Sequence, residues 1–200
     1  MQYISNISNA PSGELWLSTA SVLPSAVVRG RRNPLHSGLA HRLRRARQAA
    51  CLSFDSIADA AGLTAGTTVF NIERKPGHVP RLDTVEKIAS ALGLSPGFLA
   101  YGLDGDNPAG EGLHAHGIGE RLRTARQERG LTMRALARLA GLTDTAVRTT
   151  ETESTMPTVA TVEALAKALT FSPAWLAFNQ GPRELPERCR AAPAADAKHP

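Results

Sequence analysis

Apolar residues recur along the chain at intervals of three and four, the spacing typical of amphipathic α-helices. Leu39, Leu43 and Ala46 begin one such series. The later members of that series are Ile57, Ala58, Ala61, Val85, Ile88, Leu92, Phe98 and Leu99. A second series has Ile118, Leu122, Ala125, Leu136, Ala137, Ala140, Val162, Leu165, Leu169, Trp175 and Leu176. The pattern predicts an all-α fold.

Short polar residues and glycines indicate where these helices begin and end. Ser53 and Thr132 precede the second helix of each series, and both residue types are favoured N-caps. Gly62 and Gly141 follow that helix, where glycine readily adopts the left-handed conformation of a sharp turn. The caps predicted for the third and fifth helices are Thr64, Thr143, Ser95 with Pro96, and Ser172 with Pro173.

The two series are copies of one another. When residues 42–64 are aligned with residues 121–143, 12 of 23 positions are identical. From Pro80 to Ala100, 11 of 21 positions match residues 157–177, so the first copy holds two extra residues between Thr64 and Pro80. Two copies of this length predict two tandem small domains rather than one large fold.

The repeat divides the chain into five segments. Residues 1–38 form a leader, which is either disordered or a basic arm that carries Arg29, Arg31 and Arg32. Residues 39–102 and 118–181 are the two predicted domains, called here the first and second repeat. Residues 103–117 are rich in glycine and acid and predict a flexible linker that spans roughly 20 Å on average. Residues 182–200 predict a disordered tail.

Composition and charge narrow the classes of function. The net charge is +5, with basic residues in excess in both repeats, which suits a polyanionic partner. Two cysteines are too few for a disulfide scaffold or a four-thiolate zinc site. No apolar run is long enough to span a membrane, and no Ser/His/Asp, Cys/His or metal-ligand spacing is present. We therefore expect no catalytic residues, no metal, no cofactor and no small-molecule ligand.

One ordered set of residues in the second repeat carries a family resemblance. Its members are Arg121-Leu122-Arg123, Arg126, Gly130-Leu131-Thr132, Leu136-Ala137, Ala140-Gly141-Leu142-Thr143, Val147, Glu151, Pro157 and Leu165-Ala166-Lys167-Ala168-Leu169. Residues 118–181 thereby resemble the lambda-repressor/Cro-type (XRE) family of helix-turn-helix proteins, and residues 39–102 resemble it less closely. The resemblance implies two five-helix lambda-repressor-like domains that bind double-stranded DNA.

The resemblance places residues 143–150 in the major groove. The side chains whose spacing reaches base edges are Asp144, Thr145, Arg148 and Thr149. Arg148 is the main candidate, because its guanidinium can donate to guanine O6 and N7 together. Asp144 either accepts from a cytosine amine or stabilises the helix dipole. Thr143 is expected to cap the helix and contact a phosphate.

The first repeat departs from this pattern, because its third helix, expected over residues 65–71, has no long polar side chain before Asn71. Thr64, Thr67 and Asn71 are its candidate contacts. Either the small side chains permit close approach to DNA, or this repeat has lost base reading and serves as a packing domain. The family's phosphate-binding glutamine is replaced by Phe54 and Met133. The arginines that could neutralise phosphates instead, or simply form a solvated helix face, are Arg42, Arg44, Arg45, Arg121, Arg123 and Arg134.

Two arginines are expected to serve structure. In the family, an arginine of the first helix pairs with a glutamate after the third, so the resemblance implies partly buried ion pairs between Arg47 and Glu73 and between Arg126 and Glu151. The function implied is a cytoplasmic, nucleoid-associated transcriptional regulator, specifically a repressor, and a homodimer is left open. The alternative is an adaptor or antitoxin-like protein whose helical domains bind a partner protein.

Overall fold

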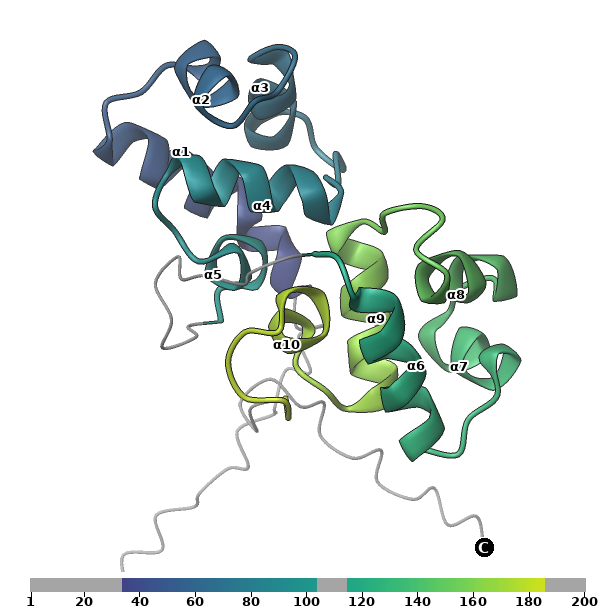
Figure 1. The fold of residues 1–200 in the computed structure, drawn as a ribbon. Coiled ribbons are helices and arrows are strands. Elements are labelled where there is room, and N and C mark those ends of the chain that lie inside the picture. Colours follow the sequence, from purple (N-terminus) through teal and green to yellow (C-terminus); the bar gives the residue numbers. More distant parts are fainter. Residues whose placement is uncertain (1–33, 104–114, 186–200) are drawn as a thin grey trace, which may run out of the picture. The chain divides into compact units, whose positions relative to one another are not determined.

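The computed structural model describes residues 34–103 and 115–185. Those residues form ten α-helices and one 3-10 helix and include no strand, which confirms the all-α prediction over the described parts (Figure 1). The elements before the second repeat are η1 (Leu35–Gly38), α1 (Leu39–Ala49), α2 (Phe54–Ala60), α3 (Thr67–Arg74), α4 (Leu82–Ala91) and α5 (Pro96–Tyr101). Those of the second repeat are α6 (Ile118–Glu128), α7 (Met133–Ala140), α8 (Asp144–Glu151), α9 (Val159–Leu169) and α10 (Pro173–Phe178). No described helix has the length and apolar character needed to cross a membrane.

Most predicted core positions are buried, and most predicted caps form. Ser53 Oγ accepts from the amide of Ser56 at 3.0 Å, and Thr132 Oγ1 accepts from the amide of Ala135 at 3.1 Å. Gly62 and Gly141 have the left-handed backbone that the turn requires, with φ of 61° and 67°. The predicted core positions that are only half-buried are Ala46, Leu92, Phe98, Ala140 and Trp175.

The start of α3 differs from the prediction. Thr64 lies in the preceding turn, and the residue before the helix is Gly66. A Cβ at Gly66 would lie 2.9 Å from the backbone nitrogen of Asp55, so the glycine permits α3 to approach the start of α2. The buried pair Val69 and Glu73 stands 78 residues before Val147 and Glu151. One extra residue of the first repeat therefore precedes α3 and the other follows it.

The two repeats belong to one compact unit that begins at Asn33. The amide of Leu82 donates to the carbonyl of Pro157 at 3.1 Å, and the amide of Val159 donates to the carbonyl of Pro80 at 3.1 Å. Pro80 and Pro157 are equivalent in the repeat, and so are Leu82 and Val159. Each repeat thus donates one hydrogen bond to the other and accepts the equivalent bond from it. Such paired contacts are typical of a two-fold symmetric dimer.

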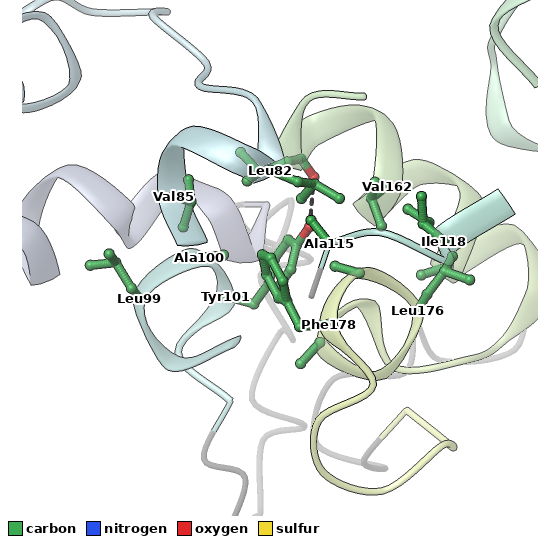
Figure 2. Close-up of a cluster of buried hydrophobic side chains, with 14 of the residues drawn as sticks. Leu82, Val85, Leu99, Ala100, Tyr101, Ala115, Ile118, Val162, Leu176 and Phe178 are labelled. Carbon is green, nitrogen blue, oxygen red and sulfur yellow. Dashed lines mark hydrogen bonds between the residues drawn. The ribbon is translucent and has the colours of Figure 1, made fainter. Parts of the chain in front are cut away.

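An apolar cluster joins the repeats beside this backbone contact. Helices α5 and α10 pack together, and residues of both repeats line the cluster, among them the equivalent pair Tyr101 and Phe178 (Figure 2). The Tyr101 hydroxyl donates to the carbonyl of Val159 at 3.2 Å. Its burial raises the pKa of Tyr101 well above the usual value. Side chains of both repeats thus share one buried apolar cluster, whereas the sequence suggested independent domains on a flexible linker.

A pair of glutamates completes the contact between repeats. The carboxylate of Glu163 on α9 accepts the amides of Leu35 and His36 at 2.7 and 3.0 Å, together with His36 Nδ1 at 2.6 Å. Its equivalent in α4, Glu86, accepts the amide of Ala115 at 3.0 Å. The segment that enters each repeat is therefore bound by the fourth helix of the other repeat.

The predicted boundaries of leader, linker and tail change accordingly. Residues 34–38, assigned from sequence to the leader, include η1 and pack on α9. Leu103 and Ala115, assigned to the linker, are buried. Leu185, assigned to the tail, is buried, and Glu184 forms an antiparallel bridge with Phe171. The rest of these three predicted segments lies outside the described residues.

The α5–α10 contact depends on a glycine, and this gives a testable prediction. A Cβ at Gly97 would lie 2.9 Å from the Cβ of Ala174 and 2.8 Å from Oε1 of Gln180, which accepts the Gly97 amide at 2.8 Å. Gly97→Ala is expected to reduce the free energy of unfolding by roughly 1–3 kcal/mol through overpacking. Urea denaturation measures this value.

The double variant Gly97→Ala with Ala174→Gly provides the control. Because the second change removes the methyl group that collides, the double variant should regain part of the lost stability. Ala174→Gly alone supplies the fourth corner of the double-mutant cycle. Strictly additive effects of the two changes would show that the methyl groups do not meet.

Candidate nucleic-acid interface

Helices α7 and α8, joined by a tight turn, form the candidate interface of the second repeat. Gly141 ends α7 in the left-handed conformation, and Thr143 caps α8 by accepting the amide of Ala146 at 3.2 Å. Leu136 and Val147 are fully buried and fix the two helices to the core. The predicted cap at Thr143 is confirmed, and the opposite side of α8 is left to face solvent.

The side chains predicted to reach bases share that solvent-facing side. Asp144, Thr145 and Arg148 are exposed, whereas Thr149 is half-buried and donates to the carbonyl of Ala146 at 3.2 Å. No described residue forms a hydrogen bond or ion pair with the guanidinium of Arg148. This group is therefore available to a ligand, while Thr149 is engaged with its own helix.

Exposed arginines flank α8. Arg134 and Arg138 lie one turn apart on the exposed side of α7. Arg138 was missed in the sequence analysis, although its spacing of four residues from Arg134 could have indicated it. Arg123 on α6 is 54% exposed, with its Nε 3.8 Å from Oε2 of Glu151. These three exposed cations lie on the helices that pack against α8.

The predicted structural ion pairs are confirmed in both repeats. Arg126 Nε and Nη2 donate to the two oxygens of Glu151 at 2.6 and 3.0 Å. Arg47 donates in the same way to Glu73 at 2.7 and 3.0 Å. Hydrogen bonding to these carboxylates raises the pKa of both arginines. Because both pairs are two-pronged and largely buried, these arginines are not free to contact a nucleic acid.

Two other candidate phosphate ligands prove to be structural. Arg121 donates to the carbonyls of Leu176 and Ala177 at 2.9 and 2.8 Å. Arg42 makes the equivalent bonds to the end of α5, at 2.9 and 2.7 Å. Burial lowers the pKa of each guanidinium. The sequence left a phosphate contact and a solvated helix face open for Arg42 and Arg121, whereas in the structure both donate to the last carbonyls of a short helix.

Residues 118–177 match the family model described as a helix-turn-helix domain. The match covers α6 to most of α10 and supports a helix-turn-helix DNA-binding domain in this part of the chain. Domains of this family are typically not enzymes. Comparisons with curated proteins and with solved structures gave no match to the chain. Within the matched residues, α7 and α8 are the two helices joined by the tight turn at Gly141.

The first repeat presents a different surface at the equivalent place. Of the three candidates, Thr64 precedes α3 and is exposed. Thr67 and Asn71 lie on α3, where Thr67 is exposed and Asn71 is half-buried. The register set by the buried residues puts Phe70 where the helix-turn-helix of the second repeat has Arg148. Phe70 is 43% exposed. The position predicted to read bases is therefore aromatic in this repeat.

The remaining arginines that were predicted to contact DNA lie in α1 or in the leader. Arg44 Nη2 donates to the carbonyl of Glu73 at 2.9 Å, although its side chain stays 40% exposed. Arg45 is exposed. Arg31 and Arg32, the predicted basic arm, lie outside the described residues. Within the described ranges, no three His, Cys, Asp or Glu side chains gather in a way that could hold a metal ion.

Proposed function

We propose that the protein is a sequence-specific double-stranded DNA-binding transcriptional regulator that reads the major groove with α8. The observation that carries this proposal is the exposed guanidinium of Arg148 on the second helix of a helix-turn-helix motif. The exposed Arg123, Arg134 and Arg138 lie on the two helices that pack against α8 and supply charge for phosphates. Repression is the proposed outcome of this binding.

The proposal extends to the family and to the tandem arrangement. The paired ion pairs of Arg47 and Arg126 and the matched caps of α2 and α7 support two copies of a lambda-repressor/Cro-type domain. The reciprocal contacts between the repeats support a single chain that is built like a dimer. In such a molecule α3 and α8 occupy equivalent positions, but α3 has Phe70 where α8 has Arg148.

Selection from a randomised duplex library at fixed salt, followed by sequencing, tests the proposal. The protein is expected to enrich one short motif. Arg148→Ala should relax one position of that motif, at a cost of about 1–3 kcal/mol in discrimination. Arg138→Ala is the matched control, because loss of a phosphate contact weakens all sequences alike and lowers the salt dependence of binding.

Two outcomes would contradict this assignment. Failure of the unaltered protein to enrich any duplex would argue against specific DNA binding. An Arg148→Ala variant that keeps every base preference would remove Arg148 from base recognition. The adaptor function remains the second candidate, and the surface of the first repeat is the observation that favours it.

A further inference from the structure

The solvent-facing side of α2 reverses the charge of its counterpart α7. Asp55 and Asp59 in α2 stand at the positions of Arg134 and Arg138 in α7, and all four side chains are exposed. The first helix of a helix-turn-helix motif lies against the DNA backbone. Arginines suit that position, whereas two carboxylates would be repelled by phosphates. This surface of the first repeat is thus unsuited to duplex DNA.

An aromatic pair lies beside these carboxylates. The rings of Phe54 and Phe70 meet edge to face, with centroids 5.5 Å apart and an interplanar angle of 87°. The guanidinium carbon of Arg47 lies 4.3 Å from the centroid of Phe54, and Arg47 is itself held by Glu73. A chain of buried contacts therefore fixes Phe54, and Phe54 in turn supports the exposed ring of Phe70. A rigid exposed aromatic loses little conformational entropy when a partner covers it.

These residues define a surface, the Phe70 face, made of Phe54, Asp55, Asp59 and Phe70. It combines an apolar centre with two carboxylates on its α2 side, and the exposed Arg74 lies one turn after Phe70 on α3. A partner that matches it must offer an apolar side chain for the aromatic pair and cationic side chains for the carboxylates. Lysine and arginine also interact favourably with aromatic rings, which adds to the match.

We propose that the Phe70 face is a docking site for a protein segment in which an apolar side chain is flanked by lysine or arginine. The site is separate from α8 and does not depend on DNA binding by that helix. Under this proposal one repeat recruits a protein while the other reads DNA. The chemistry of the Phe70 face, rather than the helix-turn-helix family, selects the partner.

Peptide display on the immobilised full-length protein identifies ligands for this surface. Selected peptides are expected to share an aliphatic or aromatic residue next to basic residues. Fluorescence polarisation of synthetic versions then measures affinity for the unaltered protein, for Phe70→Ser and for the double variant Asp55→Lys with Asp59→Lys. Each variant should weaken binding by at least about tenfold, as expected when a central anchor or the complementary charge is removed.

Control variants separate this proposal from a general loss of structure and from DNA binding. Met133→Ser alters an exposed apolar residue at the position equivalent to Phe54, and Arg148→Ala alters the α8 surface, so neither should change peptide affinity. Thermal melts of the Phe70→Ser and Asp-to-Lys variants check that the fold is retained. Because the Asp-to-Lys variant leaves the aromatic pair in place, it keeps the test valid if Phe70→Ser unfolds.

Three results would overturn the proposal. The first is the absence of any enriched peptide, and the second is a set of peptides that bind both variants as tightly as the unaltered protein. The third is a changed base preference of Phe70→Ser in the duplex selection, since this would assign the Phe70 face to DNA. Failure of the DNA proposal would instead appear as an empty duplex selection and would leave the peptide result unaffected.

Discussion

Replacement of Arg126 by alanine is expected to lower the free energy of unfolding by about 3–5 kcal/mol, because it leaves a buried carboxylate without its partner. The Glu151 side chain is 4% exposed, and both of its oxygens accept hydrogen bonds from Arg126. The same guanidinium donates to the carbonyl of Leu131 at 2.9 Å, which fixes the turn before α7. One substitution therefore removes three bonds that connect α6 with the helix-turn-helix.

Arg123→Ala is the matched control for this prediction. Arg123 is a second arginine of α6 near the same carboxylate, but it is half-exposed and its Nε lies 3.8 Å away. Exposed pairs of this kind contribute about 0–1 kcal/mol. Urea denaturation of both variants, monitored by circular dichroism, measures the difference. Equal stability of the two variants would falsify the structural role assigned to Arg126.

Local features of the fold could be predicted from sequence because they depend on near neighbours. The caps at Ser53, Thr132 and Thr143 and the turn at Gly141 are set by a few adjacent residues. The sequence repeat supported these predictions further, since each cap and turn was expected once in each repeat. The Arg126–Glu151 pair followed from a family resemblance and is confirmed at both copies of the repeat.

The contact between the repeats could not be predicted, because it joins residues that are distant in sequence. Nothing near Glu163 indicates that its carboxylate binds the amide of Leu35, 128 residues away. The roles of Arg42 and Arg121 were missed for the same reason. A basic residue on an amphipathic helix has the same local pattern whether it faces solvent or reaches the end of another helix.

The candidate site was only partly accessible to sequence reasoning. An accessible Arg148 was implied by the family resemblance, and its side chain is exposed in the structure. The opposite character of the first repeat was hidden, because the insertion before α3 obscured the register that aligns Phe70 with Arg148. Burial of Val69 and Glu73 was needed to establish that register.

Acid is expected to weaken the contact between the repeats through Glu163. Burial of this carboxyl favours its neutral form, but hydrogen bonds from the His36 ring, Lys167 and the amides of His36 and Leu35 outweigh burial. The pKa of Glu163 falls from 4.5 to about 2 as a result. Because the pKa is lower in the folded state, the stabilisation is fully present above pH 4.5 and is lost as the pH falls toward 2.

The pKa difference of about 2.5 units corresponds to about 3.5 kcal/mol, since each pKa unit is worth about 1.4 kcal/mol. Glu163→Gln removes the charge and should therefore be less stable than the unaltered protein by about this amount near pH 6. The difference between the two proteins should shrink steadily below pH 4.5 and approach zero near pH 2. Other carboxyl groups titrate in both proteins, so their contribution cancels in the comparison.

Glu86→Gln is the matched control, because Glu86 occupies the equivalent position in α4 and accepts the amide of Ala115. Because the amide oxygen of glutamine can accept the Ala115 amide as the carboxylate does, the stability of this variant should follow that of the unaltered protein between pH 2 and pH 6. Urea denaturation at several pH values across this range measures all three proteins. If the gap between the unaltered protein and Glu163→Gln stays constant across the range, the stabilisation does not come from the charge of Glu163. The contact between α9 and residues 35–36 would then be stabilised by packing rather than by this charge.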